Sequence, residues 1–232
     1  MDYYYLILVV PTLILSMIAQ FMVKSTFSKY SKIPSTNGIT GLKAADILLR
    51  SNNINDVGIE AVKGSLTDHY DPTNKKLRLS EPVYSQTSIA AVGVSAHEAG
   101  HAIQHATRWG PLVLRSTLVP VANIGSSLGP WIAIAGLAIQ GSESYGSFAQ
   151  LLFNIGIILF SGAVLFYVIT LPVEFNASNR AIAILKANNV LTADELKGAR
   201  KVLNAAAMTY VASALTAIAS LLRLILLSKR RR

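Results

Sequence analysis

The chain contains no cysteine. This absence excludes disulfide bonds, and it also removes thiolates from the ligands that any metal site can use. Charged residues are scarce as well, at 14% of the 232 residues, whereas about 25% is usual in soluble domains. A metal must therefore be held by nitrogen or oxygen atoms, and much of the chain must avoid water.

The residues that are present indicate a membrane protein. Hydrophobic residues make up 52% of the chain, and the mean hydropathy is +0.44. The net charge of +9 raises the question of nucleic-acid binding, but no stripe of Lys and Arg interleaved with aromatic residues supports it. We therefore expect no nucleic-acid partner, and we attribute the basic residues to cytoplasmic segments of a membrane protein.

Long apolar runs predict where the chain crosses the lipid bilayer. Residues 4–23 carry no charge and have the length that a helix needs to cross the hydrocarbon core. No positive charge precedes this run and no A-x-A-like site closes it, so we expect a retained transmembrane anchor and not a signal peptide. Residues 116–171 hold two more apolar runs, joined by a loop without Lys or Arg, and they predict a transmembrane hairpin.

Two polar segments, 24–110 and 172–206, separate these runs and set the expected orientation. They contain ten and five basic residues respectively, so the positive-inside rule places both in the cytoplasm, at the cell membrane. Residues 207–227 predict a fourth transmembrane helix or a deeply buried one. Four complete crossings would put the basic tail 228–232 outside, against the same rule, so either the last helix crosses incompletely or the tail departs from the rule.

Local patterns give the expected fold class. Residues 41–50 have apolar side chains at helical spacing, and residues 57–62 and 75–84 alternate as strands do, around a turn at 71–74. Thr192–Glu195, "TADE", predicts a capping box that starts a helix. We expect a mainly α membrane protein with 3–4 transmembrane helices and a small α+β part. The membrane-proximal segment 24–110 would hold most of this part.

The motif "HEAGH" at residues 97–101 is the strongest chemical signal. On a helix, His97 and His101 lie about 6 Å apart along one face, close enough to bind one metal ion. Glu98 is adjacent and can reach a water on that ion without being a ligand. An H-E-x-x-H motif arises by chance in a chain of this length on the order of one per cent of the time. The small residues Ser95, Ala99 and Gly100 fit either a helix interface or a substrate cleft.

Catalytic zinc usually takes three protein ligands and leaves a fourth position to water. His105 lies about 12 Å from His97 along the helix axis, too far for both to bind one ion. No histidine follows it. His69, upstream in "LTDHYDP", is a weaker candidate because Asp and Pro are expected in a turn for backbone reasons alone.

Elimination among the later acidic residues selects the third ligand. After His101 the carboxylates are Glu143, Glu174, Asp194 and Glu195. Glu143 lies in the hairpin loop, on the other side of the membrane, and the last two lie in the first turn of a helix, where capping explains them. Glu174 follows the hairpin, which returns the chain to the side of His97, so Glu174 is the expected ligand.

The N-terminal anchor, "LTDHYDP", "LRLSEPVY", "AHEAGHAIQH" and "LPVEFNASNRA" resemble the YugP-type family of membrane-bound neutral zinc metallopeptidases. More remotely, the sequence is similar to gluzincins of the HtpX-like type. The resemblance implies a zincin-like catalytic part built around the H-E-x-x-H helix of segment 24–110, with the third zinc ligand in segment 172–206. It implies one catalytic Zn²⁺ bound by His97, His101 and Glu174, with Glu98 as general base for peptide hydrolysis.

One position departs from the HtpX-like pattern. Those enzymes have an acid four residues after the ligand Glu, where this chain has Ser178, and Asn176 is uncharged too. A ligand histidine is commonly oriented by a carboxylate or carbonyl partner. Here that role falls to Asn176, Ser178, a backbone carbonyl or another acid.

The implied mechanism also needs a residue that stabilises the oxyanion and a surface that binds the substrate. The developing oxyanion needs a second electrophile, and the candidates are His105, His69, Tyr70 and Arg180. The strand at 75–80 is expected to bind an extended substrate by edge addition. We expect that substrate to be a protein or peptide, membrane-associated or misfolded.

Two alternatives share part of this chemistry. An intramembrane, site-2-type zinc protease would add an Asp ligand from a later span, and the only Asp after His101 is Asp194. A non-catalytic membrane adaptor would use structural zinc, which has a closed four-ligand site without a water position. The number and identity of the protein ligands therefore distinguish the membrane zinc peptidase from these two alternatives.

Overall fold

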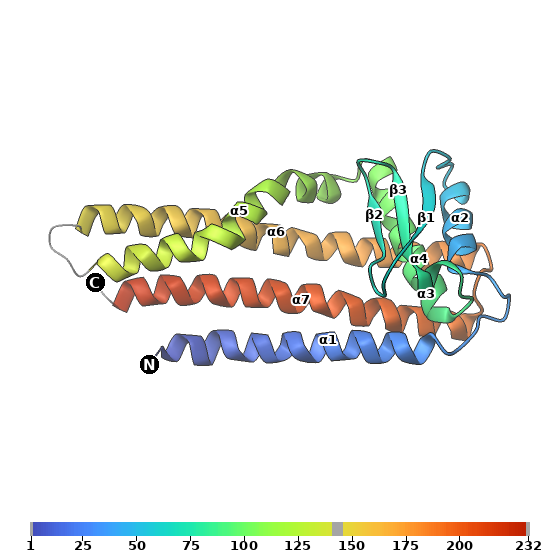
Figure 1. Cartoon of the computed structure of the whole chain (residues 1–232), viewed down its shortest axis with the longest axis horizontal. Helices are drawn as coiled ribbons and strands as arrows, with labels where there is room; N and C mark the ends of the chain where they lie inside the picture. The colour runs from blue at the N-terminus through green and yellow to red at the C-terminus, as the bar shows by residue number, and fades with distance from the viewer. Residues whose placement is uncertain (1, 141–145, 231–232) are drawn as a thin grey trace. The chain divides into compact units, whose positions relative to one another are not determined.

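The computed structural model describes residues 2–140 and 146–230, most of them helical (Figure 1). The helices are η1 (Tyr5–Val9), α1 (Val10–Tyr30), α2 (Gly41–Ser51), α3 (Glu81–Tyr84), α4 (Ile89–Ala106), α5 (Gly110–Ile139), α6 (Gly146–Ala187) and α7 (Ala193–Arg230). The strands are β1 (Gly58–Val62), β2 (His69–Asp71) and β3 (Lys76–Ser80). The chain divides into two compact units. The apolar unit comprises Met1–Ile18, Leu114–Leu171 and Thr209–Arg232, and the motif unit comprises Ala19–Val113 and Pro172–Met208.

Within the described residues, four helices are long and apolar enough to cross a membrane. They are Tyr5–Tyr30, Gly110–Ile139, Gly146–Ala187 and Ala193–Lys229. Together with the small sheet they confirm the expected class, a mainly α membrane protein with a small α+β part. The helices run beyond the apolar stretches that predicted them, since α6 continues through Glu174. Glu143 lies outside the described residues.

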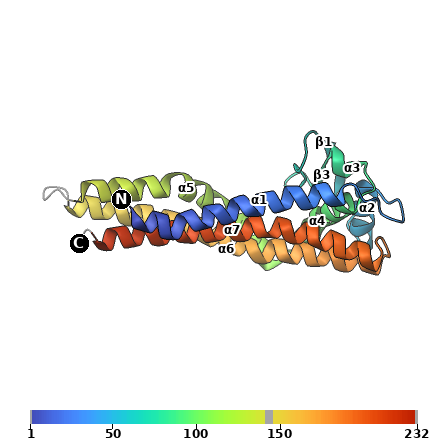
Figure 2. The same ribbon diagram turned by 90° about the horizontal axis from the view of Figure 1, so that it is seen from below.

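In the apolar unit, helices pack through small and aromatic side chains. Ala133 and Leu137 of α5 are buried with Phe153, Phe160 and Ala163 of α6. The start of α1 runs beside the end of α7 (Figure 2), and there Asp2 Oδ2 lies 2.6 Å from Arg223 Nη2. Ser16 and Thr216 hydroxyls, 3.4 Å apart, continue this contact.

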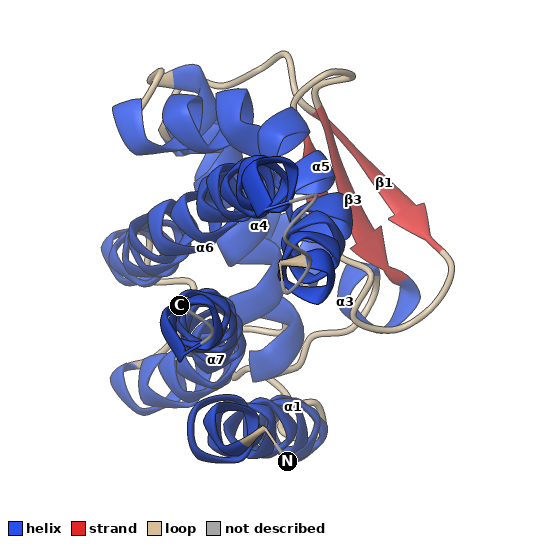
Figure 3. Cartoon of the chain, turned by 90° about the vertical axis from the view of Figure 1, so that its left-hand side faces the viewer, coloured by secondary structure: helices blue, strands red, loops and turns tan. Residues whose placement is uncertain are grey.

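The motif unit contains a three-stranded sheet in the order β1-β3-β2, drawn in red in Figure 3. β1 pairs with β3 in parallel, and β2 pairs with β3 antiparallel. The expected strands at 57–62 and 75–80 and the turn at 71–74 are confirmed, but the turn joins β3 to β2, a strand that was not predicted. Two expectations are wrong: residues 81–84 form a helical turn, which suits Pro82 at its start, and β3 is the central strand. Because both edges of β3 are paired, residues 75–80 cannot bind a substrate by edge addition.

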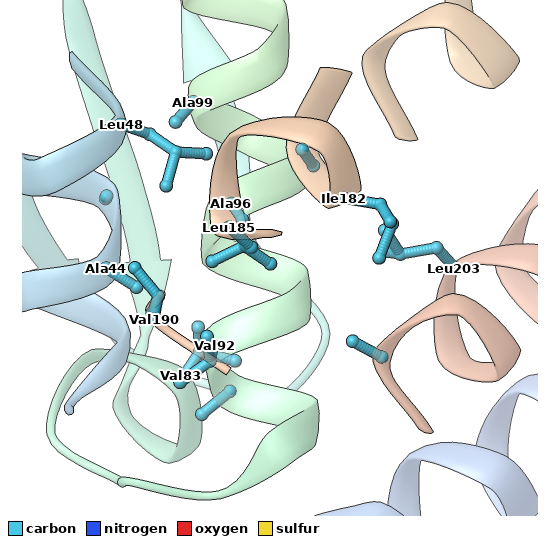
Figure 4. Close-up of a cluster of buried hydrophobic side chains, with 14 of the residues drawn as sticks. Ala44, Leu48, Val83, Val92, Ala96, Ala99, Ile182, Leu185, Val190 and Leu203 are labelled. Carbon is cyan, nitrogen blue, oxygen red and sulfur yellow. The ribbon is translucent and has the colours of Figure 1, made fainter. Parts of the chain in front are cut away.

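Helix α4 lies at the centre of the motif unit's core. Figure 4 shows buried side chains that meet from four helices, among them Leu48 of α2, Ala96 of α4, Leu185 of α6 and Leu203 of α7. The buried hydroxyl of Ser95 on α4 donates to the carbonyl of Gly41 on α2, at 2.6 Å. Neighbours on several sides thus fix the position of the helix that carries the H-E-x-x-H motif.

The predicted capping box at the start of α7 is confirmed. The backbone N–H of Thr192 donates to Glu195 Oε2 at 2.7 Å, and the N–H of Glu195 donates to Thr192 Oγ1 at 3.4 Å. The other carboxylate oxygen of Glu195 accepts hydrogen bonds from the backbone and the hydroxyl of Thr36. Glu195 therefore has a structural role.

Candidate metal centre

Two imidazoles of α4 face a single carboxylate of α6. His97 and His101 lie one helical turn apart, with ring centroids 4.7 Å from each other. Gly100, between them, lets α6 approach: a Cβ at this position would lie only 2.6 Å from the carbonyl oxygen of Ala177. Because the two backbones are so close, the short side chain of Glu174 reaches both histidines.

The three donor atoms have the separations of metal ligands. Glu174 Oε2 lies 3.2 Å from His97 Nε2 and 3.5 Å from His101 Nε2, and the Glu174 side chain is 2% exposed. Ligands held about 2.0–2.1 Å from a zinc ion at tetrahedral angles are separated by about 3.3 Å. Among the described residues this is the one group of His, Asp and Glu side chains found able to hold a metal ion. Two neutral nitrogens and a carboxylate are also the donor chemistry that zinc accepts.

Each histidine is oriented by a contact at its other ring nitrogen. His97 Nδ1 lies 3.1 Å from the hydroxyl of Ser178, and His101 Nδ1 lies 3.0 Å from Gln104 Oε1. Both Nε2 atoms are thereby directed toward Glu174. Ser178 was among the predicted partners, whereas Gln104 was missed, although its position three residues after His101 on a helix is a signal for such a contact.

The charges around the site favour a cation. Burial lowers the pKa of His101, but the carboxylates of Glu174 and Glu98 more than offset it, so the pKa is raised above its ordinary value. Glu98 is itself buried, at 9% exposure. Burial also raises the pKa of Asp68, which is half-buried and interacts with Glu98 while it accepts hydrogen bonds from Ser80. The carboxylates of Glu98 on α4 and Glu174 on α6 thus act on His101, and Asp68, just before β2, acts on Glu98.

Tyr70 of β2 is hydrogen-bonded to His105 of α4, with the phenol oxygen 2.8 Å from His105 Nδ1. Burial raises the pKa of Tyr70, so the phenol keeps its proton at neutral pH. His105 is not one of the three grouped metal-ligating side chains, which agrees with its distance along the helix.

The other two residues proposed to contact substrate have polar neighbours of their own. His69 is exposed; its Nδ1 lies 2.9 Å from the Thr67 carbonyl oxygen and its Nε2 lies 3.5 Å from Arg78 Nη1. Arg180 Nε donates to Asn176 Oδ1 at 2.7 Å. His69 is thus engaged with the β2–β3 hairpin, and Arg180 with its own helix.

A family profile described as "Putative neutral zinc metallopeptidase" matches residues 5–229. The chain belongs to this family. The chain is 47% identical over 223 residues to "Putative membrane protease YugP" of Bacillus subtilis (strain 168), and the match covers 96% of each chain. No solved structure matches it. Family membership indicates zinc as the cofactor, a peptide or protein as the substrate and the membrane as the location, which agrees with the donor set and the four apolar helices.

Proposed function

We propose that this chain is a membrane-embedded zinc metalloendopeptidase in which His97, His101 and Glu174 hold the ion and Glu98 is the general base. The observation that carries the proposal is the Glu174 carboxylate oxygen at 3.2 and 3.5 Å from the two Nε2 atoms of the H-E-x-x-H helix. These distances fit the edges of a tetrahedral zinc site. The family supplies zinc as the metal.

A bound zinc ion would polarise the peptide carbonyl and acidify the attacking water. Glu98, adjacent to His97 on α4, accepts the proton of that water and then passes it to the leaving amine. Its buried position shields the carboxylate from bulk water, which suits a group that must return the same proton to the substrate. Hydrolysis is then completed without a covalent enzyme intermediate.

Of the four candidate electrophiles, Tyr70 and His105 suit the oxyanion best. They form one hydrogen-bonded pair on the sheet side of α4, and the raised pKa of Tyr70 keeps the phenol a donor. His69 and Arg180 have the polar neighbours described above. Tyr70 therefore stabilises the developing negative charge, and His105 orients its hydroxyl.

The substrate is a membrane-associated or misfolded protein, cleaved at the cytoplasmic face of the cell membrane. The basic residues of segments 24–110 and 172–206 support this orientation. With β3 paired on both sides, an extended substrate pairs with the outer edge of β2, the strand that carries Tyr70.

The ligand set argues against the two alternatives. Asp194, which a site-2-type enzyme would need as a ligand, has a side chain 90% exposed and pairs with Lys197 at 2.8 Å. A structural zinc site needs four protein ligands, and the group found among the described residues has three. A three-ligand site leaves the position that water requires.

Zinc content and casein-type proteolysis test the proposal. Glu98→Gln is expected to keep zinc and lose at least about 100-fold in kcat, the usual contribution of a general base. Glu174→Ala is expected to lose zinc, and Glu81→Gln, at an exposed carboxylate, serves as the control. Full activity in Glu98→Gln would refute the base, and undiminished zinc in Glu174→Ala would refute the third ligand.

A further inference from the structure

Gln104 is one of the largest fully buried side chains of the molecule, and the peptidase mechanism above gives it no role. It projects from α4 one turn after His101 and contacts three polar atoms. A buried amide must satisfy its donors and its acceptor locally, because no water can replace a missing partner. The direction of each of its hydrogen bonds is therefore informative.

Hydrogen-bond acceptors on α6 determine the orientation of the Gln104 side-chain amide. Gln104 Nε2 lies 2.8 Å from the carbonyl oxygen of Val173 and 3.0 Å from Asn176 Oδ1. A backbone carbonyl only accepts hydrogen bonds, so the Gln104 atom beside it must be the NH₂ group. A flipped amide would set two oxygens against each other.

Arg180 supports the same assignment from further along α6. Its guanidinium only donates hydrogen bonds, and Arg180 Nε lies 2.7 Å from Asn176 Oδ1. The Asn176 atom at this point must therefore be the oxygen, which is then available to accept from Gln104. Two independent acceptors thus fix the amide.

The remaining atom of the amide, Gln104 Oε1, faces His101 Nδ1 at 3.0 Å. An amide oxygen has no proton to donate, so the hydrogen in this bond belongs to Nδ1. A neutral imidazole protonated at Nδ1 has its lone pair on Nε2, the atom that faces Glu174. His97 differs, because the hydroxyl of Ser178 can either donate or accept and so leaves both tautomers open.

We propose that Gln104 is a positioning residue that holds His101 in the Nδ1-protonated tautomer, which is ready to bind zinc. Val173 and Asn176 fix the orientation of the Gln104 amide. The inference rests on the proposed zinc site. Gln104 also ties the helix that carries His101 to the helix that carries Glu174. The site is thereby prepared before the ion arrives.

The tautomer can be read without zinc, by ¹⁵N NMR of the histidine side chains in the full-length protein. The metal-free chain, at a pH where the imidazoles are neutral, is expected to show His101 protonated at Nδ1, with the signal assigned by its loss in His101→Asn. Gln104→Met, similar in size but without a donor or strong acceptor, is expected to mix the tautomers and weaken zinc binding about 10–100-fold. Affinity is measured by competition with a chromogenic chelator.

Two variants separate this role from a merely structural one. Gln104→Glu keeps an acceptor for His101 but sets its second oxygen against the Val173 carbonyl, so it is expected to retain the tautomer while it lowers the melting temperature. Ser178→Ala, at the corresponding contact of His97, is expected to leave the His101 signal unchanged. A single Nδ1-protonated His101 together with unchanged zinc affinity in Gln104→Met would overturn the inference.

The wild-type measurement keeps the inference falsifiable if Gln104→Met fails to fold. A metal-free wild-type chain with His101 protonated at Nε2 would overturn it directly. Failure of the wild-type chain to bind zinc would instead refute the proposed function, because the tautomer is read in the absence of metal. The two failures are thus distinguishable.

Discussion

Tyr70 connects the small sheet to the C-terminal turn of α4 through a hydrogen bond with His105. Its hydroxyl is 2.8 Å from His105 Nδ1. Tyr70→Phe removes only this oxygen, so we expect zinc content and thermal stability to be nearly unchanged. Loss of one oxyanion donor typically costs about 10²–10³ in kcat, and steady-state kinetics on a peptide substrate measure it.

Tyr84 provides the control for this substitution. It lies in α3 and is half-buried, so Tyr84→Phe removes a phenol oxygen of similar exposure away from His105. Wild-type kcat in Tyr70→Phe would remove Tyr70 from the mechanism. A rise in KM with kcat unchanged would instead assign Tyr70 to ground-state binding of the substrate.

At the scale of single residues, the sequence selects those side chains whose chemistry follows from their spacing along the chain. His97, Glu98 and His101 follow from helical geometry, and Glu174 follows from elimination and membrane topology. The Tyr70–His105 pair and the contact of Gln104 with α6 depend on how distant elements approach each other. A single sequence does not contain that information.

At the scale of elements, the close packing of α4 on α6 is the feature that builds the metal site. Gly100→Ala would place a Cβ 2.6 Å from the Ala177 carbonyl oxygen, so one backbone must move. Overpacking of this kind costs about 1–3 kcal/mol. We expect a lower melting temperature and zinc affinity reduced at least several-fold, because displacement of α6 separates Glu174 from the histidines.

Gly110→Ala is the matched control. A Cβ at this position, at the start of α5, meets no atom within 4 Å, so zinc affinity should be unchanged. Calorimetry and chelator competition on both variants measure the difference. Equal zinc affinity in Gly100→Ala and the wild type would show that α6 tolerates the displacement.

The sequence predicted which segments form helices and which form strands. It predicted the ends of these elements and the order of the strands less well. Periodicity and length indicated α2, β1, β3 and the long apolar helices, but not β2. The central place of β3 was not predicted, because alternation along one strand does not reveal its neighbours. The continuation of α6 past residue 171 was missed as well, since a rise in polarity was taken as the end of a membrane segment, whereas a helix can leave the lipid and continue in water.

At the scale of the whole molecule, the absence of cysteine makes the proposed orientation directly testable. Single-cysteine variants Ser65→Cys, in the loop before β2, and Ser147→Cys, near the start of α6, both place the thiol at exposed positions. We expect a membrane-impermeant maleimide to label Ser65→Cys only in inverted vesicles and Ser147→Cys only in intact cells, because the polar segments carry the basic residues.

The unsubstituted chain is the blank for this measurement, because it has no thiol to label. The reverse pattern of labelling would place the zinc site outside the cell. Labelling of both variants from one side would contradict a complete crossing by α5, the long helix between the two positions in the chain.

Because Glu174 follows the hairpin in the chain, the donor atoms of the proposed metal site are synthesised at different times. During synthesis the ribosome delivers His97 and His101 well before it delivers Glu174, and the two membrane-crossing runs of the hairpin are made in between. Until that hairpin has formed, the growing chain holds two imidazoles and no carboxylate opposite them. The donor set of the proposed site is thus completed only after the apolar parts of three of the four candidate membrane helices have been made.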